Sequence, residues 1–340
     1  MVGSIILSGN STISSMALSN PDRKQFDSKT KQIKRWLQNK KTDYASYFLP
    51  FAKQLLEQLS SNGILVFSID GSAIGRGCMC LMLSVIYKEK AIPVVWKTFK
   101  SKKGHLPENA HIDLLKKLES IVPSGCRVVL TGDGEFDGCD WMKTIRSMGY
   151  DYVMRTGKNA RITEANWDVF QPQNVRLIAG TDLFFEDIEF TRKKHLCNLL
   201  IWHKKGHQSP LYLLTNLDYP PRIKQLYKKR FKIEPFFRDQ KSKGFNIQKS
   251  GLSCPQRLDN LLLATCMAYV VCIMGAVKAF KSIFYKEIAR SDGDFLSLFQ
   301  LGLRYVKHLI DLRQWRSFSI KRDLKSEKEI FKDHLFCVPF

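Results

Sequence analysis

The spacing of apolar and polar residues divides the chain into stretches with different expected structure. Before residue 60, apolar residues recur at helical spacing, and we expect helices at 15–18, 29–38 and 44–59. From residue 63 onward, apolar residues alternate or run continuously, which is typical of strands in a partly or fully buried sheet. The pattern predicts a helical N-terminal region at 1–60, followed by a domain that contains a sheet.

The elements after residue 63 follow an order that indicates a fold class. We expect three strands, a helix, a strand, a helix and a strand, at 64–70, 80–87, 91–99, 108–122, 126–130, 140–148 and 152–155. The turn Lys88-Glu89-Lys90 would join the second and third strands as a hairpin. This order is the one expected for a ribonuclease H-like α/β fold, in which helices flank a mixed sheet.

A second β-rich stretch, residues 158–214, separates this region from the helical sequence after it. Strands are expected there at 175–178, 182–190, 196–203 and 211–214. We therefore predict a core made of residues 61–157 and 215–285, a β-rich insertion at 158–214, and a C-terminal region of short helices at 286–340.

Residues 261–277 contain no charged side chain. A run of this length is close to the lower limit for a membrane-spanning helix. It also includes Thr265, Cys266, Tyr269 and Cys272, and a helix that is apolar all round also forms where other elements cover it. We expect a core helix and no membrane association.

The charge balance indicates a polyanionic partner. The 340 residues include 54 Lys and Arg against 32 Asp and Glu, which gives a formal net charge of +22. Nucleic acid is the first candidate for the partner, and an anionic membrane surface is the second. Nine cysteines at irregular spacing and the lack of a recognisable signal peptide favour a cytoplasmic location.

Basic residues gather around Trp36 in the N-terminal region. The group consists of Lys29, Lys31, Lys34, Arg35, Lys40 and Lys41. Lys34 and Arg35 lie within an expected helix and are candidates for contacts with DNA phosphates. The alternative interpretation is a solvated helix that packs its tryptophan on a neighbouring element.

Two aspartates follow expected strands of the core. Asp70 and Asp133 each lie at the carboxyl end of a buried strand, where open α/β sheets place their ligand sites. An aspartate in such a position is also a common turn former or helix cap. Either residue alone therefore carries little information about function.

A third carboxylate, Glu234, lies in a basic segment. If residues 227–241 form one straight helix, Tyr227, Arg230, Glu234 and Lys241 return to nearly the same face. A carboxylate between cations suits a metal ion beside a phosphodiester, because Arg and Lys neutralise phosphate oxygens. A solvated basic helix is the alternative.

Asp70, Asp133 and Glu234 together could hold two divalent ions about 3.5 to 4 Å apart, acting on the two sides of a phosphodiester. Ligands that are all oxygen favour Mg²⁺ or Mn²⁺ over zinc. The three residues are therefore our candidate metal ligands and catalytic residues.

The segment also carries a motif with a fixed spacing. Tyr227, two residues, Arg230, three residues, Glu234, six residues and Lys241 together resemble the signature of DDE transposases of the insertion-sequence-4 type. Asp70 and the Asp133 context T-G-D-G-E-F-D are similar to the first and second acidic positions of that family. The resemblance covers roughly residues 60 to 285, including the β-rich insertion.

The resemblance implies a metal-dependent transposase that cleaves DNA at element ends and transfers the strands into target DNA. It makes Asp70, Asp133 and Glu234 the metal ligands and places Tyr227, Arg230 and Lys241 on phosphates near the cleaved end. It also implies double-stranded DNA partners, namely terminal inverted repeats and a target, with a homodimer in the DNA complex. The location would be the prokaryotic nucleoid. Some relatives hold a flipped base on an aromatic of the insertion, for which Trp202 and Tyr212 are candidates, with a buried core aromatic as the alternative for each.

Two features depart from this simple expectation. Pro235 directly follows Glu234, so the helix either kinks there or a new helix starts with the proline in its first turn. Glu135, Asp137 and Asp239 are further carboxylates close to the expected ligands.

Two other functions fit parts of the same sequence. A catalytically inactive, transposase-derived DNA-binding protein would have the same charge and fold. A related nuclease acting on structured nucleic acid is a third possibility, although the four-point motif and the insertion favour a transposase.

Overall fold

The computed structural model describes residues 1–87, 89–101, 106–164, 167–289, 296–312 and 314. They form one 10-stranded sheet with the order β3-β2-β1-β4-β5-β10-β9-β8-β6-β7. The strands are β1 (Ile64–Gly75), β2 (Cys78–Tyr87), β3 (Lys90–Lys100), β4 (Arg127–Gly132), β5 (Asp151–Arg155), β6 (Ile162–Glu164), β7 (Trp167–Phe170), β8 (Asp182–Phe190), β9 (His195–Trp202) and β10 (Leu211–Thr215).

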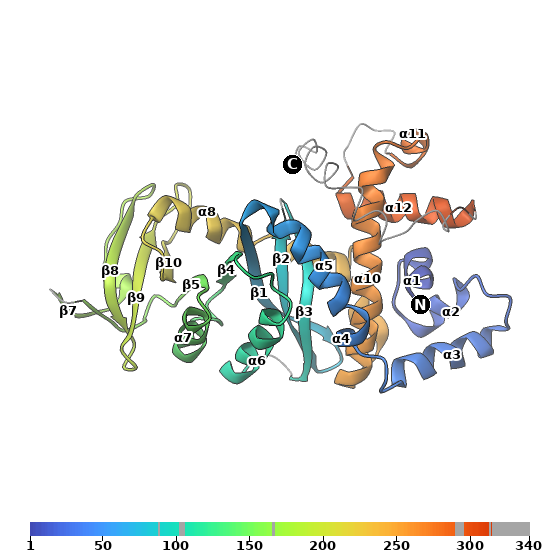
Figure 1. Cartoon of the computed structure of the whole chain (residues 1–340), viewed down its shortest axis with the longest axis horizontal. Helices are drawn as coiled ribbons and strands as arrows, with labels where there is room; N and C mark the ends of the chain where they lie inside the picture. Colours follow the sequence, from blue (N-terminus) through green and yellow to red (C-terminus); the bar gives the residue numbers. More distant parts are fainter. Residues whose placement is uncertain (88, 102–105, 165–166, 290–295, 313, 315–340) are drawn as a thin grey trace.

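The first five strands have the order and directions of a ribonuclease H-like core. β2 and β3 pair antiparallel on one side of β1, whereas β4 and β5 run parallel to β1 on its other side. The crossovers contain α6 (Glu108–Glu119) and α7 (Cys139–Ser147), which contact each other (Figure 1). The apolar runs of β1 and β2 are buried on both faces, as parallel and covered sheets require. The expected mixed α/β fold class is confirmed.

The strands expected between 158 and 214 extend this same sheet. β10 pairs antiparallel with β5, and β9 and β8 follow it outward. The expected strand at 175–178 is wrong, because these residues pair with no strand among the described parts of the chain, and Ile178 is 80% exposed. The short strands β6 and β7 were not expected. The alternation of apolar residues indicates which face of a segment is covered, but it does not indicate whether a neighbouring strand is present to form hydrogen bonds.

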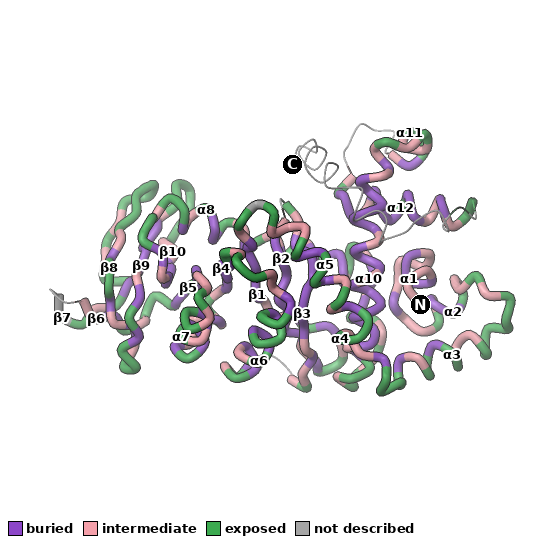
Figure 2. Tube along the Cα trace, in the orientation of Figure 1, coloured by how far each residue is buried: buried purple, intermediate pink, exposed green. Residues whose placement is uncertain are grey.

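One long helix separates the sheet from the N-terminal helices. α10 (Pro255–Ala279) contacts β3 on one side, and in Figure 1 it stands between the sheet and α1 (Val2–Ser8), α2 (Ile13–Leu18) and α3 (Phe26–Gln38). By length and composition α10 could cross a membrane, but 94% of its most apolar window is buried (Figure 2). It forms the core helix that the sequence predicted.

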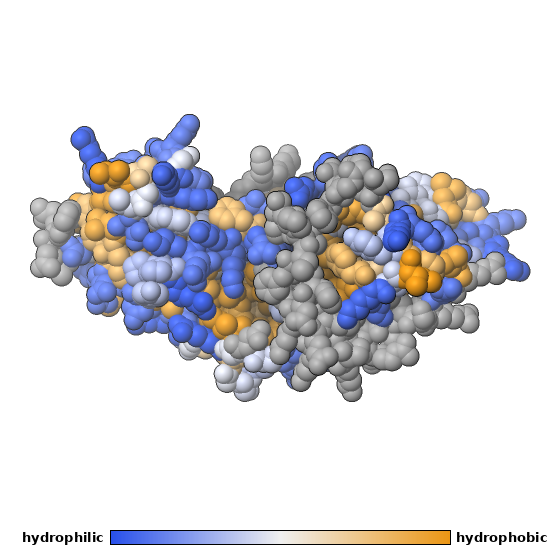
Figure 3. Space-filling view, turned by 90° about the horizontal axis from the view of Figure 1, so that it is seen from above, coloured by the Kyte–Doolittle hydropathy of each residue, from blue (hydrophilic) through white to orange (hydrophobic). Residues whose placement is uncertain are grey.

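The remaining helices complete the covering of α10 and the sheet. α12 (Leu298–Asp311) packs along α10, α11 (Tyr285–Ile288) contacts α12, and α4 (Tyr44–Tyr47) and α5 (Leu49–Leu59) lie near β3. Hydrophilic residues occupy much of the described surface seen in Figure 3, as the net charge of +22 leads one to expect. Lys88 of the expected hairpin turn and residues 315–340 lie outside the described residues.

One boundary in the core differs from expectation in a way that affects the site. β1 does not end at Asp70 but continues to Gly75. It pairs with β4 only as far as Ser68, whereas β2 remains paired with it to the end. Asp70 therefore lies just beyond the parallel pairing, on a strand held from the other side.

Candidate active site

The segment expected to be one helix forms two. α8 (Pro220–Arg230) ends at Arg230, and α9 (Ile233–Gln240) begins at Ile233, so residues 227–241 do not form one straight helix, and the alternative of a new helix with Pro235 in its first turn is confirmed. Pro235 is the third residue of α9, in the first turn, where its missing N–H costs no intrahelical hydrogen bond. A new helix, rather than a kink, is thus how the chain accommodates the proline.

Alternate residues of β1 contact the ends of both helices. Ser68, Asp70 and Ser72 lie on one face of the strand, because successive side chains of a strand point to opposite faces. The Ser68 hydroxyl donates a hydrogen bond to the Arg230 carbonyl at 3.3 Å. Lys241 ends α9 with φ −99° and ψ −122°, and its Nζ donates to Ser72 Oγ at 2.7 Å. The strand, not helical periodicity, therefore brings Arg230 and Lys241 to either side of Asp70.

The pairing of β1 with β4 places two carboxylates at the same level. Ser68 lies opposite Thr131 in the parallel register. Asp70 follows Ser68 by two residues, and Asp133 follows Thr131 by two residues. The two aspartates therefore lie side by side just beyond the carboxyl end of the β1–β4 pairing. The Asp133 carboxylate also accepts the Glu135 N–H at 3.0 Å, which fixes the loop after β4.

The guanidinium of Arg230 lies within ion-pair distance of all three expected carboxylates. Its Nη2 is 2.8 Å from Glu234 Oε1, and its Nη1 is 3.9 Å from Asp133 Oδ2 and 4.0 Å from Asp70 Oδ2. The arginine side chain is 9% exposed, whereas that of Glu234 is 54% exposed. One buried cation thus joins side chains that come from within β1, from the loop after β4 and from α9.

Burial and charge act against each other at Asp70. Desolvation, followed by the negative charge of Asp133, raises the pKa of Asp70 to about 6, while Arg230 and the hydrogen bond from the Gly71 N–H oppose the rise. The contributions of Asp133 and Glu234 to this rise reflect the crowding of carboxylates around Asp70. Such crowding is favourable only where cations balance it.

The donor set suits a hard divalent cation. The gathered ligand atoms are carboxylate oxygens, which magnesium and manganese prefer. The three carboxylates point toward Arg230. Among the described residues, no three Asp, Glu, His or Cys side chains are arranged closely enough to form a metal-binding group. The residue types therefore fit such an ion, with Arg230 holding them together.

Comparison with known proteins identifies the family. The family described as the transposase DDE domain matches residues 51–271, which is more than half of the chain and includes every carboxylate discussed above. The chain belongs to the transposase DDE domain family. A search of curated proteins finds no match for its sequence.

Two solved structures that the chain resembles have low TM-scores and low sequence identity. A cryo-EM structure of a piggyBac transposase synaptic complex with hairpin DNA has 13% identity and a TM-score of 0.42, covering 81% of this chain and 57% of that one. A crystal structure of Aa-Ago with externally bound siRNA has 13% identity and a TM-score of 0.27, covering 58% and 28%. The chain thus spans little more than half the length of the solved transposase, and the family assignment rests on the sequence match.

The structure does not bring the N-terminal basic residues to the carboxylates. Lys34 and Arg35 are exposed on α3, whose Ile33 and Leu37 are buried. α3 lies on the other side of α10 from the sheet of the DDE domain (Figure 1). If both surfaces contact DNA, the DNA must extend along the molecule.

The aromatic residues singled out in the sequence are buried. Tyr227 is 1% exposed, so its phenol does not face solvent, and this burial raises its pKa while the neighbouring Arg230 opposes the rise. Trp202 is 9% exposed, with Lys228 Nζ 5.6 Å from its ring centroid, and Tyr212 is 8% exposed. The interpretation of Trp202 and Tyr212 as core aromatics describes this structure better than an open base-binding role.

Two further carboxylates of the DDE domain form hydrogen bonds with other parts of the core. One residue near Asp70 was not predicted from the sequence. Glu135 Oε1 accepts the Leu106 N–H at 3.0 Å, and Asp137 Oδ2 accepts the Thr156 hydroxyl at 2.6 Å. Ser72, the partner of Lys241, was not predicted. Its position two residues after Asp70 is a signal in the sequence, but only the break between α8 and α9 shows which cation it meets.

Asp239, the third further carboxylate, gives a prediction about stability. Burial raises its pKa to about 7 against the nearby positive charges of Lys90 and Arg238. Between about pH 4 and 7 the unfolded chain loses this proton while the folded chain keeps it, so this group lowers the free energy of unfolding as pH rises. We expect the difference in free energy of unfolding, Asp239→Asn minus the unaltered protein, to increase by roughly 1 to 3 kcal/mol from pH 5 to pH 8. Urea denaturation at the two pH values measures it. Equal differences at both pH values would contradict this.

Proposed function

We propose that the chain is an active transposase of the insertion-sequence-4 type, which cleaves DNA strands at the ends of a mobile element and joins them to target DNA. The observation that carries the proposal is the convergence of Asp70, Asp133 and Glu234 on Arg230. In a chain of this family with a net charge of +22, three carboxylates at one sheet edge have a direct catalytic use.

The three carboxylates are the residues that would hold two divalent ions, Mg²⁺ or Mn²⁺. When bound, such ions lower the pKa of an attacking water or 3′-hydroxyl and stabilise the leaving oxygen of the phosphodiester. The protein's own part is to bring the oxygens together and to keep them ionised. Arg230 favours the ionised form of Asp70, against the burial that raises its pKa.

Cations at the same edge would hold the DNA phosphate. Arg230 offers a planar donor group that can turn from the carboxylates to phosphate oxygens, and Lys241 offers a point charge on the other side of Asp70. Burial lowers the pKa of Lys241, and the charge of Asp70 opposes this effect. Double-stranded DNA at the terminal repeats, a target duplex and a homodimer in the DNA complex are the partners we propose. The cytoplasmic, nucleoid-associated location stays a prediction.

The first test separates binding from chemistry. Asp70→Asn, Asp133→Asn or Glu234→Gln removes the charge that a cation needs and keeps the side-chain shape, so strand cleavage should fall by roughly 10²- to 10³-fold or more. Arg230→Ala should give an intermediate loss. Binding should stay within a few-fold, because Lys and Arg contacts dominate affinity. The assay is Mg²⁺-dependent cleavage of a labelled duplex that carries the element's end, once the DNA flanking the gene has been searched for inverted repeats, with a gel shift on the same duplex.

A matched control is Glu57→Gln, which changes an exposed carboxylate on α5 and should cleave normally. Full cleavage by Glu234→Gln would exclude the catalytic assignment. No cleavage by the unaltered protein on its true ends would favour the DNA-binding protein without activity.

The second test concerns the contact between Ser72 and Lys241. Ser72→Ala removes the acceptor of the ammonium and should slow cleavage by roughly 10- to 150-fold, since hydrogen bonds to charged groups contribute about 1.5 to 3 kcal/mol. Ser72→Thr keeps a hydroxyl and should recover most of the rate. In a Lys241→Ala background, Ser72→Ala should cost nothing more; additive losses would show that Ser72 acts through another group. Ser84→Ala, which removes another buried hydroxyl of the sheet, is the control.

The third test concerns the N-terminal basic helix. Lys34→Ala with Arg35→Ala should weaken binding to the element end and lower the log-log salt slope by about 0.9 for each lost phosphate contact. Lys281→Ala with Lys286→Ala makes the same change in net charge at two exposed lysines and should leave the slope unchanged. Identical slopes for both pairs would remove α3 from the interface.

A further inference from the structure

Two adjoining cavities lead away from the loop that carries Asp133. The first, about 720 Å³, is lined by that loop at Asp137 to Cys139, by the connection between β5 and β6, and by the turn between β8 and β9. The second, about 630 Å³, continues from the same turn past Arg161, which directly precedes β6, to the end of β7 and the residues after it. Both are lined by Thr191 and Arg192, so they meet at this turn. We call the combined depression the basic groove.

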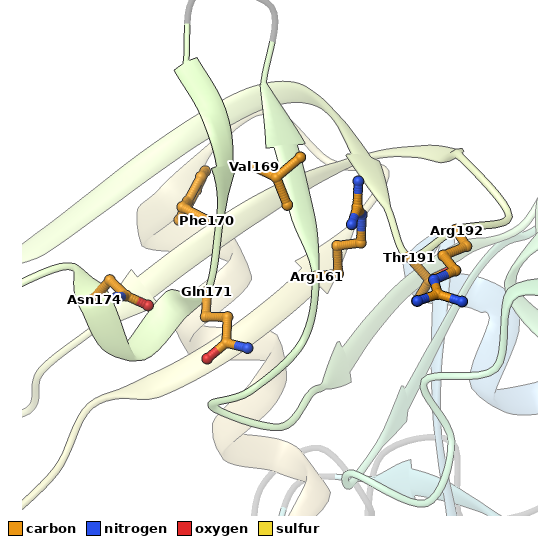
Figure 4. Close-up of a pocket in the computed structure, with 7 residues that line it drawn as sticks. All are labelled: Arg161, Val169, Phe170, Gln171, Asn174, Thr191 and Arg192. Atoms are coloured by element: carbon orange, nitrogen blue, oxygen red, sulfur yellow. The ribbon is translucent and has the colours of Figure 1, made fainter.

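Exposed cations line the basic groove along its length. They are Lys158 and Lys193 in the first cavity, Arg161 in the second, and Arg192 in both. Figure 4 shows Arg192 and Arg161 in a row that continues to the amides of Gln171 and Asn174. The spacing of cations along an open channel suits a chain of phosphates better than a small compact ligand.

The two acidic residues of the groove have other partners. Glu108 Oε1 accepts the Trp141 N–H at 2.7 Å, and Asp137 Oδ2 accepts the Thr156 hydroxyl at 2.6 Å. Lys193 forms an ion pair with Asp140 at 2.8 Å, but both side chains are 55% exposed, so the pair is weak and can exchange for phosphate. With four cations against these two carboxylates among its lining residues, the groove keeps a positive character.

The turn that presents Arg192 is held in an uncommon backbone conformation. Thr191 has φ of 60° and Lys194 has φ of 49°, and positive φ is rare for a β-branched residue such as Thr191. The Thr191 N–H donates to the Arg161 carbonyl at 2.9 Å, and Thr191 Oγ1 lies 3.2 Å from Cys139 Sγ. These contacts pin the turn between the two cavities. Strain retained in this way is typical of residues that position a functional group.

We propose that the basic groove binds the phosphodiester backbone of the DNA that continues beyond the phosphate cleaved at the three carboxylates. This inference rests on the proposed function. Its geometric basis is that Asp133 and Asp137 belong to the same loop between β4 and α7, so one end of the groove starts next to the candidate active site. The other end, with Arg161 and two amides, lies on the insertion strands.

The test compares Arg161→Gln/Arg192→Gln with Lys281→Gln/Lys286→Gln, which removes the same charge elsewhere. Both full-length variants are first checked for an unchanged thermal melt. Gel shifts without divalent metal then use two duplexes, one with the element end and its native flank and one that stops at the cleavage position. We expect the groove variant to bind the flanked duplex about 10-fold or more weakly, with a salt slope lower by about 1.8, and the shorter duplex as before.

A separate strand-transfer assay, using pre-cleaved ends and an unrelated duplex, distinguishes the source of the DNA. A loss confined to strand transfer would contradict the assignment to the flanking DNA and would show that the groove holds target DNA instead. Equal behaviour of the two variants in all assays would overturn the proposal while leaving cleavage by the unaltered protein intact. Conversely, loss of flank binding in a protein that does not cleave would reject the proposed function and keep the groove.

Discussion

Three carboxylates at one sheet edge repel one another, and the buried guanidinium of Arg230 balances that repulsion. Two unit charges about 4 Å apart near a protein surface interact by roughly 4 kcal/mol, which is more than an exposed ion pair contributes. Arg230 lies 2.8 to 4.0 Å from oxygens of Asp70, Asp133 and Glu234. The crowded site is therefore compatible with a stable fold, and the same arginine is available to phosphate when DNA and metal arrive.

This arrangement depends on β1 more than on the helices. Ser68, Asp70 and Ser72 share one face, and the two serines bind the Arg230 carbonyl and the Lys241 ammonium. Pro235 prevents a single helix from placing these cations. The residues of the motif still come together, because side chains two residues apart on β1 point to the same side. Ser68 contacts the end of α8, and Ser72 contacts the end of α9.

The sequence predicted the parts of the fold whose local pattern is strong. The buried runs of the core strands, the apolar 261–277 helix and the two aspartates at the β1 and β4 edge were found because burial leaves a clear apolar signature. The carboxylates were selected by residue type and motif spacing. Their roles, and the domain boundaries, remain predictions.

Other features depend on contacts that a linear pattern does not contain. The strand expected at 175–178 has no partner, and β1 extends past Asp70 because β2 continues beside it. The meeting of Arg230 with three carboxylates requires β1, β4 and two helices together. Ser72 was missed because its partner lies 169 residues away in the chain. Long-range pairing of this kind is visible only in three dimensions.

The central claim is that Asp70, Asp133 and Glu234 form one site that accepts divalent ions in exchange for Arg230. The most direct measurement is Mn²⁺ binding, followed by electron paramagnetic resonance, with the full-length protein bound to its cognate duplex. We expect tight Mn²⁺ binding that is lost in each of Asp70→Asn, Asp133→Asn and Glu234→Gln but kept in Glu57→Gln. Unchanged Mn²⁺ binding in the three variants would contradict it.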